Sequence, residues 1–364
     1  MNQNAAGPPG PGAKRRIRVL IVDDSALVRD ILARGLAADP GIEVVGTAPD
    51  PYVARDRIVE LKPDVLTLDV EMPRMDGVDF LRKLMPQYPI PVVMVSALTQ
   101  RGKKITLDAL EAGAVDFVAK PSTDVARGLS AMMMELLTKV KIASTANVSH
   151  WKAKRPEAPI RARTGSKALD ESSDKVIAIG ASTGGTEAIR SIISQFPPNT
   201  PGTVIVQHMP AGFTKAFAER LNTQAAMEVK EAADGDRVMP GRVLLAPGGF
   251  QMTVVRSGGV YRVQIKSGEK VCGHIPSVEV MMNSVAEYVG SNAVGVMLTG
   301  MGRDGADAML AMRKAGARNI AQDEATSVVF GMPKEAYERG GAERLVPLGD
   351  IPQAVLDLLA GGFK

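Results

Sequence analysis

The chain has 364 residues, which suggests two domains at the usual size of roughly 100–200 residues each. Its 44 basic and 40 acidic residues leave a net charge of +4, and 4% of its residues are aromatic. This balance does not indicate nucleic-acid binding, because it predicts neither a strongly basic surface nor aromatic stacking platforms. The single cysteine, Cys272, excludes an internal disulfide and a cysteine-rich zinc site.

No apolar segment of the sequence approaches the roughly 20 residues that a membrane-spanning helix requires. The first segment, Met1 to Arg16, is rich in Gly and Pro and lacks the apolar part of a secretory signal. We therefore expect a cytoplasmic protein without direct membrane insertion, in which residues 1–15 form a disordered tail.

Residues 16–143 repeat a short β-branched segment followed by a helical pattern five times. This alternation predicts an α/β domain with a parallel sheet covered on both faces, in the doubly wound order 2-1-3-4-5. The expected strands are Ile17–Val22, Glu43–Ala48, Val65–Asp69, Pro91–Ser96 and Val115–Ala119, and the expected helices include Ala26–Ala38, Tyr52–Leu61 and Val125–Ile142.

The periodic pattern stops near Ser144 and resumes at Lys175. Residues 144–174 contain two prolines, several serines and a group of basic residues with few acidic neighbours. This composition predicts an extended, solvated linker, and docking to an acidic surface is the alternative.

Residues 175–364 again alternate strand and helix patterns, which predicts a second doubly wound α/β domain. Two segments separated by Ser257-Gly258-Gly259 predict an additional β-hairpin. The expected elements are the strands Val176–Gly180, Thr203–Gln207, Arg242–Ala246 and Ala293–Leu298, the hairpin strands Gln251–Arg256 and Val260–Lys266, and the helices Thr186–Gln195, Lys215–Leu221 and Val278–Tyr288.

Three carboxylates are expected at one edge of the first sheet. Asp23 and Asp24 follow the first strand, and Asp69 ends the third. These two strands are neighbours in the predicted order, so their carboxyl ends bring the three side chains into one crevice. Carboxylates this close need a cation to remain ionised, and oxygen ligands with room for water suit Mg²⁺.

Two further polar residues are expected at the same edge. Ser96 ends the fourth strand, and Lys120 ends the fifth. Their hydroxyl and ammonium groups would contact anionic oxygens on a modified Asp69. The set predicts phosphoryl transfer to this aspartate, with Mg²⁺ and Lys120 neutralising the developing charge. Each residue alone could be a helix cap or a surface charge, but their occurrence at successive strand ends argues against that.

The second half contains a candidate nucleophile. Gly180-Ala181-Ser182-Thr183-Gly184-Gly185 follows a predicted strand and precedes a predicted helix. It has the G-x-S-x-G form of a nucleophile elbow, in which glycines permit a sharp turn and the helix N-terminus favours negative charge. Taken alone, the motif is more typical of an ordinary helix cap, so Ser182 as a nucleophile requires a base nearby.

The chain offers three histidines as the base. His150 lies in the predicted linker. His208 follows the strand Thr203–Gln207 and is expected at the same sheet edge as Ser182, which makes it the preferred base. His274 is the second choice, as a residue of the substrate site or a structural hydrogen-bonding group.

The histidine in turn needs an orienting carboxylate. Asp304 follows the strand Ala293–Leu298 and is expected at the same edge, whereas Asp307 and Asp323 are weaker candidates that are more typical of surface residues. The chain order serine, histidine, aspartate differs from the serine, aspartate, histidine order of α/β-hydrolases, so that fold is excluded.

Residues Ile17 to about Ile142 resemble response-regulator receiver domains, which have a flavodoxin-like fold. The resemblance implies that Asp69 is the phosphoacceptor, that Asp24 and Asp69 bind Mg²⁺, and that Asp23 helps through water. Phe117 lies where the family often has a switch aromatic residue, and core packing is an equal alternative. The matching segments are Val22-Asp23-Asp24-Ser25, Asp69, Met72-Pro73-Arg74-Met75-Asp76-Gly77, Ser96-Ala97 and Lys120-Pro121.

Residues from Val176 onwards resemble the catalytic domain of chemotaxis response-regulator protein-glutamate methylesterases, the CheB family. The resemblance implies a triad of Ser182, His208 and Asp304, oxyanion donors from the backbone near Thr183 and Met301, and no cofactor in this domain. The matching segments are Ile179-Gly180-Ala181-Ser182-Thr183-Gly184-Gly185, Gln207-His208-Met209-Pro210, Ala246-Pro247-Gly248-Gly249, His274-Ile275-Pro276-Ser277-Val278, Met297-Leu298-Thr299-Gly300-Met301-Gly302-Arg303-Asp304-Gly305 and Gln322-Asp323.

The resemblance further implies a function in chemotaxis. The expected enzyme is a serine hydrolase that demethylates glutamyl methyl esters on the cytoplasmic helices of chemoreceptors, releases methanol and gives sensory adaptation; many members also deamidate receptor glutamines. Phosphorylation by a chemotaxis histidine kinase would activate it, because the unphosphorylated receiver packs over the catalytic crevice in this family. The complete triad argues against an adaptor with an inactive centre. The absence of a helix-turn-helix output argues against a DNA-binding regulator.

Overall fold

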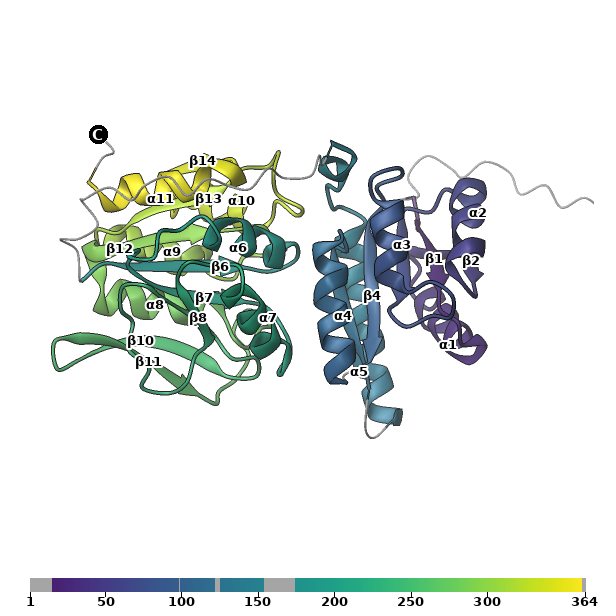
Figure 1. Cartoon of the computed structure of the whole chain (residues 1–364), viewed down its shortest axis with the longest axis horizontal. Helices are drawn as coiled ribbons and strands as arrows, with labels where there is room; N and C mark the ends of the chain where they lie inside the picture. The colour runs from purple at the N-terminus through teal and green to yellow at the C-terminus, as the bar shows by residue number, and fades with distance from the viewer. Residues whose placement is uncertain (1–14, 98, 122–124, 154–173, 362–364) are drawn as a thin grey trace, which may run out of the picture.

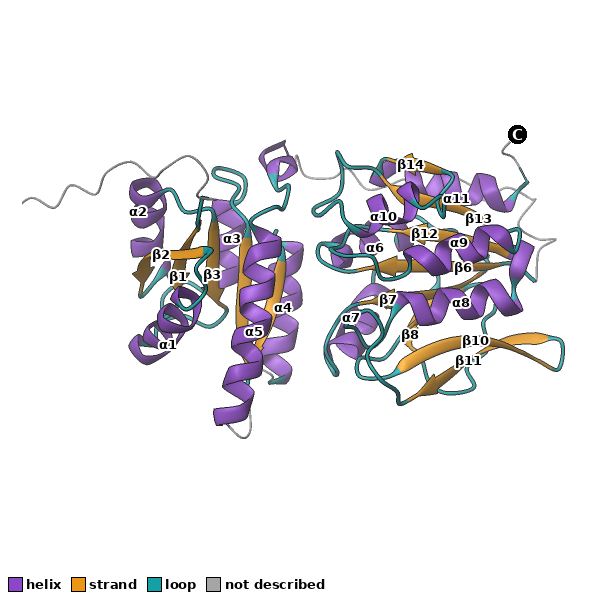
Figure 2. Ribbon diagram, turned by 180° about the vertical axis from the view of Figure 1, so that it is seen from behind, coloured by secondary structure: helices purple, strands orange, loops and turns teal. Residues whose placement is uncertain are grey.

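The structure, a computed structural model, describes residues 15–97, 99–121, 125–153 and 174–361. Two α/β domains lie side by side (Figure 1), and helices α4 and α5 form the side of the first domain that faces α6 and α7 of the second (Figure 2). The expected disordered tail lies outside the described residues except for Arg15. No helix in the described part of the chain is long and apolar enough to cross a membrane.

The first domain has the predicted five-stranded parallel sheet in the order β2-β1-β3-β4-β5, which confirms the flavodoxin-like architecture. Its three central strands are almost fully buried, as the helices on both faces require. The elements are β1 (Ile17–Val22), α1 (Ala26–Ala37), β2 (Ile42–Ala48), α2 (Pro51–Leu61), β3 (Val65–Asp69), α3 (Gly77–Leu84), β4 (Val92–Ala97), α4 (Gln100–Glu111), β5 (Asp116–Lys120) and α5 (Val125–Ala143).

Helix starts in this domain follow from local capping chemistry. The side chains of Ser25, Asp50, Asp76 and Thr99 each accept a hydrogen bond from a backbone N–H in the first turn of the helix that follows. These caps fix where each βα loop ends and so where the strand-end side chains lie.

The second domain is built on a seven-stranded parallel sheet in the order β14-β13-β12-β6-β7-β9-β8, with the predicted hairpin β10-β11 beside it. Its elements are β6 (Val176–Ala181), α6 (Gly185–Ile193), β7 (Gly202–Gln207), α7 (Phe213–Asn222), β8 (Glu228–Glu231), β9 (Arg242–Leu245), β10 (Gln251–Ser257), β11 (Val260–Lys266), α8 (Val278–Tyr288), β12 (Ala293–Met297), α9 (Ala306–Lys314), β13 (Arg318–Gln322), α10 (Met332–Glu338), β14 (Arg344–Val346) and α11 (Ile351–Leu359).

The first part of the expected linker is packed rather than extended and solvated. Residues Ser149–Ala153 form a short 3-10 helix, and the ring of Trp151 covers Gly113 of the first domain closely enough that an added Cβ would lie 3.0 Å from it. The backbone N–H of Asn147 donates to the carbonyl of Val328 in the second domain, at 2.8 Å. This segment therefore contacts both domains, while residues 154–173 lie outside the described part.

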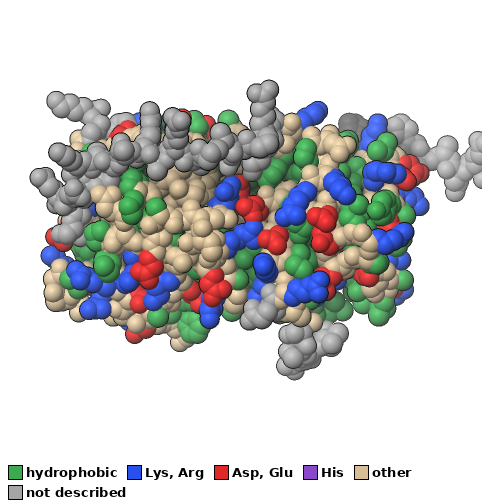
Figure 3. All heavy atoms as spheres, viewed as in Figure 1, with side chains coloured by type: hydrophobic (Ala, Val, Ile, Leu, Met, Phe, Trp, Pro, Cys, Tyr) green, Lys and Arg blue, Asp and Glu red, His purple; other side chains and the backbone are tan. Residues whose placement is uncertain are grey.

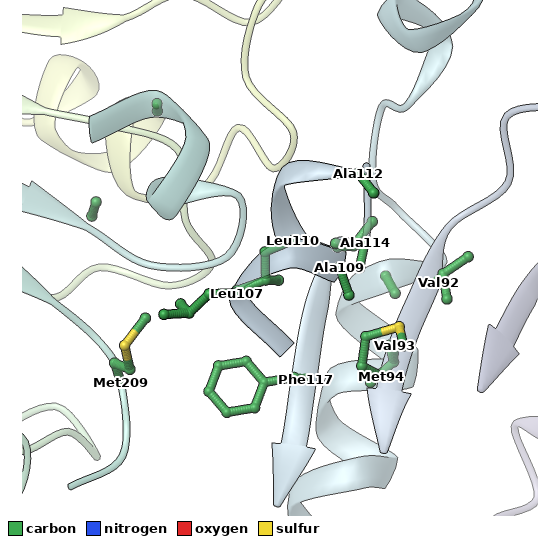
Figure 4. Packing of buried hydrophobic residues seen from close by; sticks show 14 of the residues in the cluster. Val92, Val93, Met94, Leu107, Ala109, Leu110, Ala112, Ala114, Phe117 and Met209 are labelled. Atoms are coloured by element: carbon green, nitrogen blue, oxygen red, sulfur yellow. The ribbon is translucent and has the colours of Figure 1, made fainter. Parts of the chain in front are cut away.

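An apolar contact joins the two domains, and their buried residues form one continuous cluster. The rings of Phe117 in β5 and Phe213 in α7 lie 4.4 Å apart between centroids. Figure 4 shows Leu107 and Phe117 pointing toward Met209 of the second domain. Phe117 is thus 3% exposed and part of the interdomain contact, so it combines core packing with a place at the interface.

Charged residues border this apolar contact. Arg220 of α7 forms ion pairs with Asp108 and Glu111 of α4. Figure 3 shows basic and acidic side chains side by side along the junction of the two domains. The interface is therefore an apolar centre with an ionic rim, the composition expected of a contact that can also open.

Candidate active site

The turn that carries Ser182 has the geometry of a nucleophile elbow. Ser182 follows β6 and precedes α6; its N–H donates to Thr299, and its carbonyl accepts from Gln207 Nε2 at 2.9 Å. Gly184 has φ 78°, and a Cβ on Gly300 would lie 2.7 Å from Ser182 Cβ. The turn therefore needs glycine both for its backbone conformation and for the close approach of the neighbouring loop.

His208 and Asp304 meet at the same sheet edge because β6 lies between β7 and β12. His208 Nε2 lies 2.7 Å from Asp304 Oδ2, and both side chains are buried. An ionised carboxylate only accepts, so Nε2 carries the proton and Nδ1 keeps its lone pair. Nδ1 is buried without a hydrogen-bond partner among the described residues, which leaves its lone pair available to act as a base.

Asp304 lies at the N-terminus of helix α8. Its carboxylate accepts from the Ser277 hydroxyl at 2.7 Å and from the backbone N–H groups of Val278 and Glu279 at 2.7 and 3.0 Å. Burial raises the pKa of Asp304, but the hydrogen bonds and charge of His208 and the donors of α8 outweigh it and lower the pKa below its usual value. The group is thus held as an anion that can stabilise a charged imidazole.

His274 lies directly against His208. The two rings are stacked, with centroids 3.7 Å apart and planes 8° from parallel. Burial and the nearby His208 lower the pKa of His274 to about 4. His274 therefore stays neutral at physiological pH, so it fixes the plane of the His208 ring without repelling a proton on it.

Two backbone N–H groups are candidates for an oxyanion site. The N–H groups of Thr183 and Met301 donate to no other described residue. Thr183 follows Ser182 directly, and Met301 follows Gly300, whose backbone approaches the Ser182 side chain. Free N–H groups beside a nucleophilic oxygen are the donors that a tetrahedral intermediate requires.

The first domain closes one side of this site. A narrow crevice is lined by Ser182, Thr183 and His208 together with Asp116 and Phe117 of β5. The Thr183 hydroxyl donates to Asp116 Oδ2 at 2.7 Å. In this arrangement a bulky partner could not reach Ser182 from the side that the first domain occupies.

The predicted acidic pocket is formed at the edge of the first sheet. Carboxylate oxygens of Asp23, Asp24 and Asp69 all lie within 4.8 Å of one another, and Lys120 Nζ lies 3.0 Å from both Asp23 and Asp69. Burial raises the pKa of Asp69 to about 6, helped by the charge of Asp23 and opposed by Lys120. The one ammonium group of Lys120 thus does not offset the burial of these carboxylates, and their oxygen atoms fit a divalent cation such as Mg²⁺.

Ser96 lies beside this pocket but faces away from Asp69. Its side chain is fully buried, accepts from the Thr106 hydroxyl at 2.7 Å and lies 3.4 Å from the carbonyl of Gly102. The structure therefore brings together four of the five residues predicted at this edge and directs the fifth toward α4.

Both domains of the chain are similar to known proteins. Residues 177–355 match the CheB methylesterase family, and residues 19–132 match the response regulator receiver domain. A protein-glutamate methylesterase/protein-glutamine glutaminase of Syntrophotalea carbinolica is 72% identical over 95% of this chain and 98% of its own. One of Sulfurimonas denitrificans is 54% identical over 94% and 99%.

The chain belongs to the CheB methylesterase family. The crystal structure of the Thermotoga maritima CheB methylesterase catalytic domain is similar to the second domain, with 40% identity and a TM-score of 0.50, and covers 51% of this chain and 99% of its own.

The hydrogen bonds that hold Asp304 and Thr183 in place were not predicted from the sequence. The donors to Asp304 from Ser277, Val278 and Glu279 could have been inferred, because Ser277 precedes a helical pattern whose first N–H groups must find acceptors. The contact of Thr183 with Asp116 could not, since it joins residues 67 positions apart in two domains. Of the weaker candidates for the orienting carboxylate, Asp307 pairs with Arg339 on the surface, and Asp323 accepts hydrogen bonds within its own turn.

Proposed function

We propose that this chain is a phosphorylation-gated protein-glutamate methylesterase and protein-glutamine glutaminase that acts on chemoreceptors in the cytoplasm. The names of its relatives support the activity. The observation that carries the proposal is the pairing of His208 with Asp304 at 2.7 Å beside the Ser182 turn, with Nδ1 left free.

In the proposed reaction, Ser182 Oγ attacks the carbonyl carbon of a glutamyl methyl ester while His208 Nδ1 takes its proton. Asp304 stabilises the resulting imidazolium, and the N–H groups of Thr183 and Met301 stabilise the oxyanion. His208 then protonates the leaving methoxide, which departs as methanol. Water then attacks the acyl-serine, with His208 taking a proton from the water and returning it to Ser182 Oγ. With glutamine as the substrate, the leaving group is ammonia.

The receiver domain would regulate the esterase activity. Asp69 would accept a phosphoryl group from a chemotaxis histidine kinase, with Asp23, Asp24 and Asp69 holding Mg²⁺, which supplies positive charge against the phosphoryl oxygens. Lys120 would contact the same oxygens, and Ser96 would have to turn from Thr106 toward them. Such a turn changes the packing of β4 against α4, the helix whose acidic residues pair with Arg220.

A receptor-demethylation assay tests this function. The full chain is mixed with methyl-labelled receptor membranes and Mg²⁺, with and without a small acyl-phosphate donor, and released methanol is counted. We expect release that requires Ser182 and increases with the donor. A folded, phosphorylated protein that releases no methanol and no ammonia would favour an adaptor without activity.

A further inference from the structure

Asp116 of the receiver domain projects a carboxylate into the catalytic crevice. Its Oδ2 accepts a hydrogen bond from the Thr183 hydroxyl at 2.7 Å, and it lines the same crevice as Ser182 and His208. Thr183 is 5% exposed, and the hydrogen bond of its hydroxyl goes to this carboxylate. A carboxylate of the receiver domain therefore accepts the hydrogen bond of a hydroxyl next to the candidate nucleophile.

The other oxygen of Asp116 is already held within its own domain. Oδ1 accepts from the backbone N–H of Phe117 at 2.8 Å and lies 2.9 Å from Lys139 Nζ. Lys139 also lies 2.9 Å from Glu135 and donates to the carbonyl of Phe117. These contacts orient the carboxylate before the domains meet, so that Oδ2 faces Thr183 without further ordering.

Thr183 is likewise held in place on the catalytic side. Its carbonyl accepts from the Thr299 hydroxyl at 3.0 Å, and its free N–H is a candidate oxyanion donor. The hydroxyl is the one remaining polar group of this residue, and it points to where Asp116 enters. In the absence of the receiver, that hydroxyl would face the space that a substrate side chain must occupy to reach Ser182.

We propose that Thr183 is a substrate-positioning residue whose hydroxyl binds a carboxyl-derived oxygen of the glutamyl side chain, and that Asp116 inhibits the enzyme by occupying this position as a product-like carboxylate. The inference rests on the proposed function, since the product of that reaction is a glutamate carboxylate with the same group as Asp116. The receiver thus blocks the site in two ways: it fills the space, and it places there a carboxylate like that of the product.

The position of Asp116 also connects it to phosphorylation. Strand β5 carries Asp116 at its first residue and Lys120 at its last. At about 3.3 Å per residue, roughly 13 Å of one strand separates the blocking carboxylate from the lysine that contacts Asp69. A shift of β5 when Lys120 engages a phosphoryl group would move Asp116 away from Thr183.

The test uses the full chain without phosphodonor and measures two rates. One is receptor demethylation, and the other is covalent labelling of Ser182 by a small fluorophosphonate, which needs no receptor. Asp116→Asn should raise both rates about tenfold, because it replaces a charge-assisted hydrogen bond by a neutral one. Glu135→Gln is the matched control: it removes a carboxylate from Lys139 without contacting Thr183, and should leave both rates near wild type.

Variants of the partner residue test the same contact from the other side. Thr183→Val should also raise basal labelling, and the double variant with Asp116→Asn should add little to either single change. In the phosphorylated enzyme, Thr183→Val should raise the receptor KM about tenfold with kcat within a few-fold, whereas Thr183→Ser should restore the KM. A purely structural role would not give this division between KM and kcat.

Two results would overturn the inference. If Asp116→Asn labels at the wild-type rate while the phosphodonor still accelerates wild-type labelling, Asp116 does not block the site. If Thr183→Val leaves the receptor KM unchanged, its hydroxyl does not bind substrate. A wild-type protein without turnover would count against the proposed function instead, and the labelling rates would still decide whether Asp116 blocks Ser182.

Discussion

Asp304 and Asp69 are both buried aspartates at the carboxyl ends of parallel strands, yet their pKa values shift in opposite directions. Asp304 accepts hydrogen bonds from His208, Ser277 and two backbone N–H groups, and its pKa is lowered despite burial. Asp69 has Lys120 and one backbone N–H but also faces Asp23, and burial raises its pKa to about 6.

The number of donors explains the difference. The Asp304 site is complete within the protein, which suits a group that must be an anion at every turnover. The Asp69 site has Lys120 but too few donors to offset burial and the charge of Asp23, which suits a group that binds a cation. The protein alone stabilises the anionic form of Asp304 in the second domain, whereas Asp69 in the first domain needs a bound cation.

Loss of the nucleophile should have the largest effect. Ser182→Ala should lower kcat for receptor demethylation by at least 10³-fold, and by roughly 10⁶-fold if the three residues act as a unit as in other serine hydrolases. Ser191→Ala, on the surface-facing part of α6, is the control. Turnover near wild type in folded Ser182→Ala would show that another residue attacks the ester.

Neutralising Asp304 should cost somewhat less. Asp304→Asn keeps the shape of the side chain but favours the wrong tautomer of His208, so we expect a loss of roughly 10⁴-fold in kcat by analogy with serine proteases. Asp307→Asn, three residues away and exposed, should retain wild-type kcat. The assignment of the orienting carboxylate would be wrong if the two variants behaved alike.

Removing one hydrogen-bond donor from Asp304 should have a smaller effect. Ser277→Ala removes one of four donors and the cap of α8, so we expect kcat to fall about tenfold and the free energy of unfolding to fall by about 1 kcal/mol. Ser277→Thr keeps the hydroxyl and should restore most of both. Equal kcat in the alanine variant and wild type would mean that the remaining donors suffice.

The smallest effect is expected on the free energy of unfolding, through the ionisation of Asp69. Because the pKa of Asp69 in the folded protein, about 6, lies above the usual value of 3.8, folding takes up a proton there. The contribution of this group to stability therefore falls as pH rises from about 4 to 6. In Mg²⁺-free buffer at pH 7, Asp69→Asn should therefore raise the free energy of unfolding by about 1–3 kcal/mol.

Denaturant unfolding at several pH values checks this expectation. The advantage of Asp69→Asn should shrink toward pH 4, and Mg²⁺ should stabilise the wild type but not the variant. Asp79→Asn, on the exposed side of α3, serves as the control for a lost charge. A wild type that is more stable than Asp69→Asn at pH 7 without Mg²⁺ would contradict the assigned pKa direction.

Much of this arrangement follows from the sequence because parallel strands end at one edge. The ends of the expected strands, together with the motifs that follow them, place Ser182, His208 and Asp304 at one edge of the second sheet and the acidic residues at one edge of the first. Strands β8, β13 and β14 were not predicted. Glu228–Glu231 holds one apolar residue, Arg318–Gln322 holds two, and Arg344–Val346 is only three residues long. Short strands of this kind carry too little periodicity to be recognised.

Other features depend on how distant segments meet. The stacking of His274 on His208 and the contact of Asp116 with Thr183 are set by loop paths and domain docking, which leave no local pattern in the sequence. The orientation of Ser96 toward Thr106 is of the same kind, because strand position fixes which edge a residue occupies but not its rotamer.

The most direct test of the account compares receptor demethylation by the full chain with and without a small acyl-phosphate donor, for wild type and Asp69→Ala. We predict that the donor accelerates the wild type in the presence of Mg²⁺ and that Asp69→Ala stays at the basal rate under both conditions. Equal rates with and without donor, in wild type whose Asp69 is shown to be phosphorylated, would contradict the claim that the receiver gates this enzyme.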